Sequence, residues 1–239
     1  KYDFLSENSL NQINFKELPN IAPNYFFVSK DFSSQKDYDN GFKLTDLFPL
    51  NNVGIVTAKD TVLIKDTKKE LRSSVETFYQ IEVEQNLIRQ ISYRPFDEKF
   101  VYYDIKLIER AREKLMQHFI NGKNIGIALC KQFKTGDTYQ HVSISNKIIE
   151  SCFVSNRTSE ITSIFPLYLY PETIVQQTIG QSTERTPNLN TEIVKQIADK
   201  LGLNFTNEKE TTKDTFAPID ILDYIYAVLH SPTYREKYK

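Results

Sequence analysis

The 239-residue sequence contains no tryptophan, two cysteines (Cys130 and Cys152) and seven glycines. Two cysteines without a CxxC pair argue against a disulfide scaffold or a cysteine zinc site, and they are typical of a reducing cytoplasm. No GxxxxGK[ST] or GxGxxG motif marks a phosphate-binding loop. Motifs of serine hydrolases (GxSxG) and zinc proteases (HExxH) are missing too. We therefore expect no catalysis and no metal or cofactor site within this chain.

The sequence also lacks an excess of one charge and any long apolar run. It has 30 Lys and Arg against 31 Asp and Glu, for a net charge of -1. A nucleic-acid partner would therefore contact a local basic patch, because no global field attracts it. No apolar run reaches the roughly 20 residues of a membrane-spanning helix, and residues 1–10 contain no signal-peptide core. These absences predict a cytoplasmic protein that does not contact membranes.

The arrangement of apolar residues predicts an α+β fold. Short β-branched and aromatic segments predict strands, among them residues 53–57, 61–64, 87–91, 100–103, 124–129, 139–145 and 165–170. The expected organisation is a strand-rich region over residues 1–175, a polar linker over 176–189 and a helical C-terminal region over 190–239. The sequence ends inside a predicted helix, so we expect a truncated piece of a longer protein.

Arg94 lies in the segment Tyr93-Arg94-Pro95-Phe96-Asp97, between two predicted strands. Pro95 cannot donate to a sheet ladder and marks an edge, bulge or turn. In one interpretation Arg94 pairs with Asp97 and closes this turn. In the other, the rigid corner aims the arginine at a partner.

The segment from Arg89 to Lys134 is locally basic. It contains ten Lys and Arg residues and five Asp and Glu residues, which leaves +5 in a chain of net charge -1. Asp104 is the expected N-cap of an amphipathic helix that buries Ile108, Ala111, Leu115 and Phe119 and exposes arginines. Such a segment suits DNA phosphates, although surface Lys and Arg residues most often face only water.

An ordered set of motifs resembles one known family, the C-terminal specificity (target-recognition) domain of Type ISP restriction-modification enzymes and related adenine-specific DNA methyltransferases. The motifs extend over nearly the whole chain and are Leu47-Phe48-Pro49, Gly54-Ile55-Val56-Thr57-Ala58-Lys59-Asp60, Tyr93-Arg94-Pro95-Phe96-Asp97 with Tyr102-Tyr103, Arg110-Ala111-Arg112, Asn124-Ile125-Gly126-Ile127, Phe165-Pro166-Leu167-Tyr168-Leu169-Tyr170, and residues 223–235. The sequence departs from the family where Lys59 replaces a common Arg, and near Glu98-Lys99. Either difference could alter which bases are chosen.

The resemblance implies recognition of a double-stranded DNA sequence on behalf of a larger enzyme. That enzyme would methylate adenine N6, with or without ATP-dependent cleavage. S-adenosylmethionine, ATP and magnesium would then bind upstream domains, and this chain would contact the upstream methyltransferase domain. The alternative is a protein-interaction module whose C-terminal helices dock onto the parent enzyme.

The resemblance and the residue types together give ten candidate DNA-binding residues. They are Thr57, Lys59, Asp60, Arg94, Arg110, Arg112, Lys131, Gln132, Lys134 and His141. The first three form an expected loop between strands that enters a groove. The two helix arginines would contact phosphates, and the last four would read bases from strand ends and a polar strand face.

Overall fold

The computed structural model describes residues 2–18, 20, 22, 25–27, 33–132, 139–154, 160–171 and 184–237. The chain divides into an N-terminal unit, Lys1–Gly41, and a main unit, Phe42–Lys239. The N-terminal unit contains α1 (Tyr2–Glu7), a 3-10 turn η1 (Leu10–Gln12) and α2 (Gln35–Asp39). None of its described residues is buried, so this described part has no hydrophobic core of its own.

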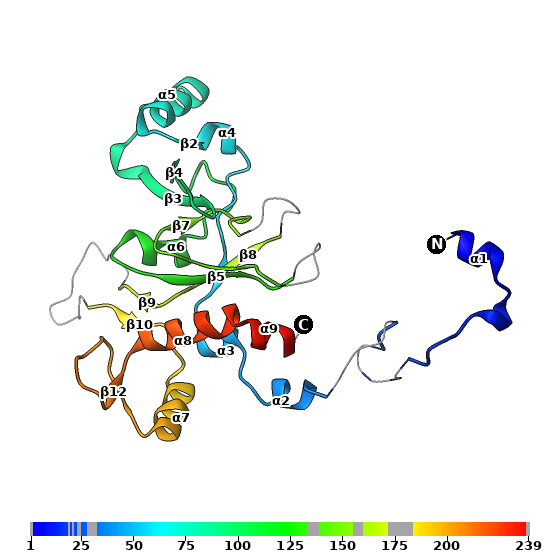
Figure 1. The fold of residues 1–239 in the computed structure, drawn as a ribbon. Coiled ribbons are helices and arrows are strands. Elements are labelled where there is room, and N and C mark those ends of the chain that lie inside the picture. Colours follow the sequence, from blue (N-terminus) through cyan, green and yellow to red (C-terminus); the bar gives the residue numbers. More distant parts are fainter. Residues whose placement is uncertain are drawn as a thin grey trace. The chain divides into compact units, whose positions relative to one another are not determined.

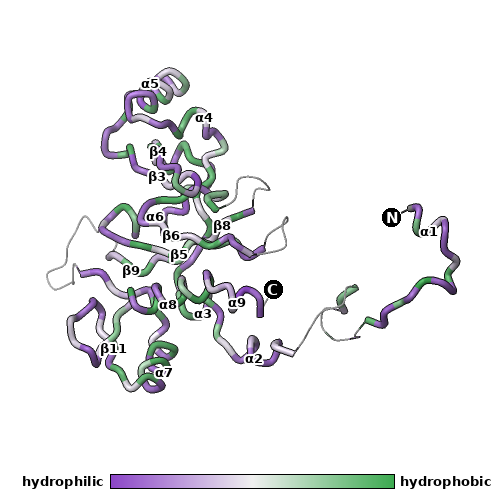
Figure 2. Tube along the Cα trace, viewed as in Figure 1, coloured by the Kyte–Doolittle hydropathy of each residue, from purple (hydrophilic) through white to green (hydrophobic). Residues whose placement is uncertain are grey.

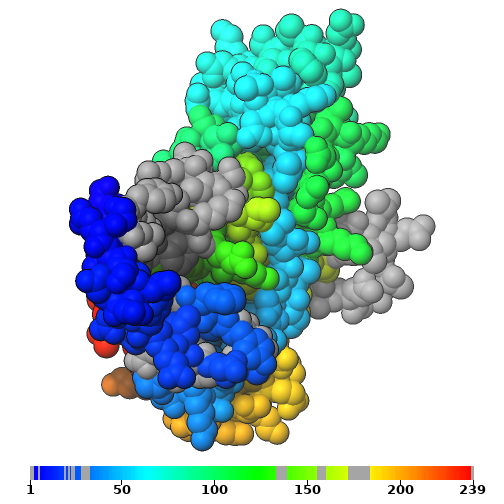
Figure 3. Space-filling view, turned by 90° about the vertical axis from the view of Figure 1, so that its right-hand side faces the viewer, coloured from blue at the N-terminus to red at the C-terminus, as the bar shows by residue number. Residues whose placement is uncertain are grey.

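The first sheet of the main unit has the strand order β2-β4-β3-β7. Its strands are β2 (Ile64–Lys65), β3 (Ile88–Arg94), β4 (Asp97–Tyr102) and β7 (Ile148–Ile149). Two helices, α4 (Asp60–Leu63) and α5 (Lys68–Tyr79), precede β3, as does the 3-10 turn η2 (Gln85–Leu87). The α5 helix begins at a Thr67–Glu70 capping box, in which each side chain satisfies a free backbone donor of the other residue. Figure 3 shows α4 and α5, in cyan, as one continuous surface.

The second sheet has the strand order β1-β8-β5-β6. Its strands are β1 (Asn52–Val53), β5 (Gly126–Cys130), β6 (Val142–Ser145) and β8 (Thr162–Pro166). The β5 strand pairs antiparallel with β6 and β8 and is buried along its whole length, as expected of a central strand (Figure 1). Two further helices of the main unit are α3 (Leu44–Leu47) and α6 (Glu113–Ile120).

The C-terminal part combines helices with short strand pairs. β9 (Tyr168–Leu169) pairs with β10 (Thr186–Pro187), and β11 (Asn204–Phe205) pairs with β12 (Thr215–Phe216). The helices are α7 (Thr191–Leu201), α8 (Pro218–His230) and α9 (Pro232–Lys237). Asn190 caps α7 and Gly202 ends it at φ 65°, as the sequence predicts. Hydrophobic and hydrophilic residues both line α7 in Figure 2, as expected for an amphipathic helix.

Two hydrophobic clusters form the core of the main unit. The first joins the β2-β4-β3-β7 sheet to α5 and α6, through residues such as Val75, Ile91 and Leu115. The second joins β5 and β8 to α7 and α8, through Ile127, Phe165 and other buried side chains. The mixture of sheets and helices confirms the predicted α+β class. Because the second cluster contains residues from both sides of the predicted linker, the C-terminal helices are packed against strands.

Asn188, inside the predicted linker, is 1% exposed. Its amide nitrogen donates to the carbonyls of Leu50 and Pro166, at 2.7 and 2.8 Å, and its side-chain oxygen accepts from the Leu50 N–H. This single side chain therefore satisfies backbone groups of two distant segments. Residues 176–183 of the predicted linker lie outside the described residues, and the proposed domain boundaries stay a prediction.

Two predicted elements are wrong; one directly follows the candidate residue Asp60, and the other contains the candidates Arg110 and Arg112. The predicted strand at 61–64 is largely the single helical turn α4, because the backbone N–H groups of Val62 and Leu63 both bond to the Lys59 carbonyl. The predicted helix from Asp104 begins only at Glu113, because Arg110 forms a two-way backbone bridge with Val56. At Arg110 a tertiary contact thus overrides the local preference for helix, whereas α4 is formed by local hydrogen bonds to the Lys59 carbonyl.

Candidate nucleic-acid interface

The segment from Thr57 to Asp60 is tied into the protein interior by one carboxylate. Thr57 is 2% exposed, and its hydroxyl donates to one oxygen of Asp60. The Tyr93 hydroxyl donates to the other Asp60 oxygen at 2.9 Å. Burial, together with the hydrogen bond and negative charge of Asp60, raises the pKa of Tyr93 to about 12. Thr57 and Asp60 thus hold the segment in place by hydrogen bonds inside the fold.

Lys59 is the exposed charged residue of this segment. Its ammonium lies 5.1 Å from the ring centres of both Phe78 and Tyr79, at the end of α5. Such cation–π contacts position the ammonium group and leave its charge available to an anion. Lys59 therefore presents a positive charge at a defined place on the surface.

Arg94 pairs with Glu150, not with Asp97. Its Nη1 lies 2.5 Å from Glu150 Oε2, and the two side chains are 19% and 7% exposed. Glu150 also accepts from the Ser151 hydroxyl at 2.6 Å and from the Cys152 N–H at 2.8 Å. The expected ion pair between Arg94 and Asp97 is therefore wrong, although the two residues are opposite each other in the strand register at the β3–β4 turn. A carboxylate from far along the chain provides a stronger, less solvated partner.

The β3–β4 turn carries an aromatic residue in an unusual backbone conformation. Phe96 has φ 63° and its side chain is fully exposed. The left-handed region is unfavourable for a bulky side chain. The turn is held on one side by Arg94 and Glu150 and on the other by Lys99, whose Nζ lies 2.5 Å from the Asp66 carboxylate. The hydrogen bond that Lys99 donates to Asp66 raises the pKa of Lys99 and outweighs burial, which lowers it.

Arg110 and Arg112 lie before α6 and not on its exposed face. Arg110 Nε is 3.6 Å from the Glu109 carboxylate, and both side chains are more than half exposed. Arg112 occupies the N-cap position of α6 at φ 55°. Its Nε is buried and has no hydrogen-bond partner among the described residues. The two arginines are therefore in different environments, one solvated and one partly enclosed.

The remaining candidates lie around the end of β5. Lys131 and Gln132 are exposed directly after this strand, and Lys134 lies outside the described residues. His141 is half-buried before β6, with its ring 5.8 Å from the Tyr139 ring. The structure thus brings Thr57, Asp60 and Arg94 into one polar cluster. Lys131, Gln132 and His141 belong to the separate β5–β6 end.

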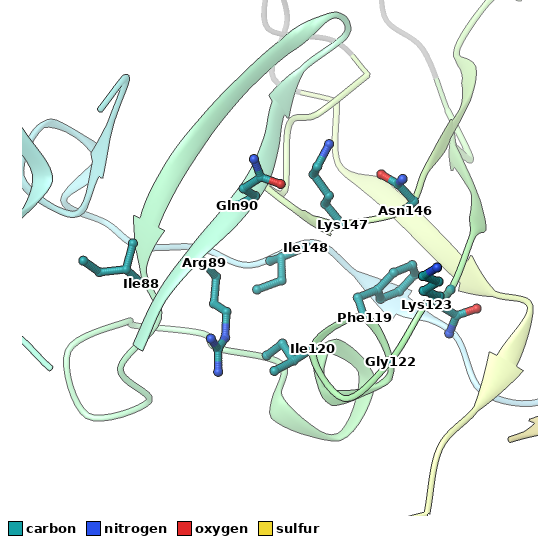
Figure 4. A pocket seen from close by; sticks show the side chains of 11 residues that line it. Ile88, Arg89, Gln90, Phe119, Ile120, Gly122, Lys123, Asn146, Lys147 and Ile148 are labelled. Carbon is teal, nitrogen blue, oxygen red and sulfur yellow. The ribbon is translucent and has the colours of Figure 1, made fainter. Parts of the chain in front are cut away.

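A cavity of about 520 Å³ lies elsewhere in the main unit, between β3, the end of α6 and the β6–β7 turn (Figure 4). Its lining residues are Ile88, Arg89, Gln90, Phe119, Ile120, Gly122, Lys123, Asn124, Asn146, Lys147 and Ile148. The sequence places Arg89 and Lys123 in the basic segment, but no local signal joins them to residues 146–148. Only the parallel pairing of β3 with β7 does so.

The described residues contain no group of three or more His, Cys, Asp or Glu side chains arranged to hold a metal ion. Both cysteines are free thiols. Burial raises the pKa of Cys130 and of Cys152, which keeps each as the poorly nucleophilic thiol. Among the described helices, none combines the length and apolarity needed to cross a membrane.

A family model described as the Type ISP C-terminal specificity domain matches residues 79–239. The chain belongs to this family. Its fold is similar to that in the structure of a DrdV–DNA complex, with a TM-score of 0.69 and 21% identity over 99% of this chain and 26% of that one. No curated protein sequence is significantly similar to it.

Two further structures share the fold of this specificity domain. A nuclease-deletion mutant of the Type ISP restriction-modification enzyme LlaGI, in complex with a DNA substrate mimic, matches with a TM-score of 0.65 and 16% identity, over 98% of this chain and 23% of that one. The ATP-dependent Type ISP restriction-modification enzyme LlaBIII, bound to DNA, matches with a TM-score of 0.57 and 17% identity, over 83% of this chain and 14% of that one. The chain therefore spans 26%, 23% and 14% of the lengths of these three chains.

The part matched by the specificity-domain model contains the cavity, Arg94 and the β5–β6 end, whereas Thr57, Lys59 and Asp60 precede it. The Asp60–Tyr93 hydrogen bond connects the two parts. The strands β1 and β2 and the residue Asp60, which precede position 79 in the main unit, are thus joined to the matched part by strand pairing and by this hydrogen bond.

Proposed function

We propose that this chain recognises a DNA target sequence for a larger restriction-modification enzyme. The observation that supports this function most directly is membership of the Type ISP specificity-domain family over residues 79–239. The likeness in fold to enzymes whose structures contain DNA or a DNA mimic is consistent with it. Base-edge contacts would select the sequence, and contacts to phosphates would set position and orientation.

The parent enzyme, in this proposal, methylates adenine at N6, with or without ATP-dependent cleavage. S-adenosylmethionine, ATP and magnesium would be bound by its other domains. The chain itself would be non-catalytic, with raised thiol pKa values at Cys130 and Cys152. Its contribution to the reaction is to choose where the parent acts and to contact the methyltransferase domain of the same polypeptide.

Among the ten candidate residues, the exposed cations Lys59, Arg110 and Lys131 are the best placed for DNA. Gln132, exposed beside Lys131, has an amide that can pair with adenine through two hydrogen bonds. Thr57 and Asp60 hold the segment that carries Lys59 from inside the fold, and Arg94 holds the neighbouring β3–β4 turn. A role of this kind predicts that replacing Arg110, a phosphate contact, weakens binding to all sequences, whereas replacing Lys131 or Gln132 changes the preferred sequence.

The decisive experiment is selection from a pool of randomised DNA duplexes by the 239-residue chain at low salt. One short enriched sequence supports target recognition, and a Gln132→Ala variant should change that sequence. Uniform recovery of the pool would contradict it. A chain that enriches no sequence but binds the methyltransferase part of its parent would support the docking module instead.

A further inference from the structure

The cavity beside β3 combines an apolar floor with a cationic rim. Phe119, Ile120 and Ile148 provide apolar surface, and in the close-up Phe119 and Ile120 lie between Arg89 and Lys123 (Figure 4). In the same view Gln90, Asn146 and Lys147 project toward one side, and Arg89 projects from the opposite side of β3, as successive residues of a strand do. A volume of about 520 Å³ is within the range of small-molecule binding sites, which are mostly apolar with a few placed polar groups.

The charged residues that line this cavity are all cations. Arg89, Lys123 and Lys147 line it, and no carboxylate does. Lys147 forms an ion pair with Glu98, and its side chain is 18% exposed. Among the described residues, the side chains of Arg89 and Lys123 have neither an ion-pair nor a hydrogen-bond partner. Two unpaired cations at the edge of a cavity favour an anionic ligand.

The wall that carries Lys123 is fixed by its backbone. The Lys123 carbonyl accepts from the Tyr170 hydroxyl at 2.5 Å and from Arg185 Nη1 at 2.9 Å. Gly122 leaves space for the Tyr170 ring, since a Cβ at this position would lie 2.3 Å from it. Asn124 donates to the carbonyls of His118 and Tyr168. The Lys123 side chain therefore extends from a rigid loop, which lowers the entropic cost of binding a ligand.

The opposite wall, the β6–β7 turn, is fixed in a similar way. The Ser145 hydroxyl lies 2.9 Å from the Ser92 hydroxyl of β3, and it also accepts from the Lys147 N–H at 3.1 Å. Ile148 pairs with Ile91 in the sheet. Asn146, exposed within this turn, thus has a defined position beside β3. Both walls are preformed around an open, positively charged space.

We propose that this cavity binds one nucleotide unit of a DNA strand. Arg89 and Lys123 contact its phosphates, the apolar floor packs against its sugar or base, and Gln90 and Asn146 bond to its base edge. This inference rests on the proposed function of DNA recognition and adds a contact site outside the ten candidate residues. A simple inorganic anion would leave the apolar floor and the two amides without a role.

The test compares duplex binding by the wild-type chain and by an Arg89→Ala/Lys123→Ala variant over a series of salt concentrations. Each phosphate contact contributes about -0.9 to the slope of log affinity against log salt. The double variant should therefore have a slope shallower by about 1.8, because it lacks two contacts. The control Lys195→Ala/Lys200→Ala removes two exposed lysines of α7 and should keep the wild-type slope. Thermal melting should be unchanged, since neither cavity cation has a partner to lose.

A separate readout tests the two amides. A Gln90→Ala/Asn146→Ala variant, passed through the randomised-duplex selection, should lose preference at one base position while keeping the wild-type salt slope. Free deoxyadenosine monophosphate, titrated without DNA, should bind at least a hundredfold more weakly than the selected duplex.

The possible failures are distinguishable. If the wild-type chain binds DNA and the Arg89→Ala/Lys123→Ala variant keeps the full slope, the cavity assignment is overturned while target recognition stands. If the free nucleotide binds as tightly as the duplex, the cavity takes a small ligand and the DNA assignment is overturned. If the wild-type chain binds no duplex at low salt, the proposed function fails and this inference fails with it.

Discussion

Replacing Arg94 by alanine leaves the Glu150 carboxylate buried without a cationic partner. Glu150 is 7% exposed and lies 2.5 Å from the Arg94 guanidinium. Its hydrogen bonds from Ser151 and Cys152 remain, but they do not neutralise the charge. Breaking a buried ion pair on one side costs about 3–5 kcal/mol in the free energy of unfolding. For a unit of this size, 1 kcal/mol corresponds to about 2–4 °C, so the melting temperature should fall by about 6–20 °C.

The assay is urea unfolding followed by far-UV circular dichroism, since the chain has no tryptophan for fluorescence. The matched control is Arg72→Ala on α5. Arg72 pairs with Glu76 at 3.4 Å, and both side chains are about 40% exposed. An exposed pair of this spacing contributes about 0.3–0.5 kcal/mol. The control should therefore unfold close to the wild-type midpoint.

A second variant separates lost charge compensation from lost packing. In Arg94→Ala/Glu150→Gln the buried carboxylate becomes a neutral amide, whose oxygen still accepts from the Cys152 N–H. This variant should recover more than half of the stability lost in Arg94→Ala, because no uncompensated charge remains. The reasoning would be refuted by a loss under about 1 kcal/mol in the single variant, or by a double variant no more stable than the single one.

Three further predictions concern stability. Phe96 has φ 63°, so Phe96→Asn should raise the urea midpoint, with a gain of up to about 1 kcal/mol, and Phe96→Val should lower it. The reverse order would contradict backbone strain at this position. Asn188→Ala should cost at least about 2 kcal/mol in urea unfolding, because buried backbone groups lose their partners, and a neutral effect would show that water replaces the amide. Burial, and then the positive charge of Arg235, lower the pKa of His230. The contribution of His230 to the free energy of unfolding is therefore complete above its pKa in the unfolded chain, about 6.5. That contribution declines as the pH falls from this value toward the lower pKa of the folded protein. Urea midpoints at pH 7.5 and 5.0 should accordingly differ more for the wild type than for His230→Gln, and equal differences would contradict this.

The sequence alone determined the α+β class, the N-cap at Asn190 and the helix end at Gly202. These features depend on local chemistry, namely apolar spacing, a side-chain acceptor and a residue that tolerates positive φ. The family was also visible in ordered motifs, and the match over residues 79–239 supports it. Local signals of this kind are present in the chain before it folds.

Only the tertiary structure decided which residues are exposed and which pair with each other. Arg94 has a carboxylate 56 positions away as its partner, and Arg110 is held by Val56 in a bridge that delays the start of α6. The cavity joins β3 to a turn more than 50 positions later, through the pairing of Ile91 with Ile148. Contacts between distant segments form only when the two sheets and their helices bury a shared core. For this reason residue types could indicate the chemistry of the candidate DNA-binding residues but not where those residues lie in the fold.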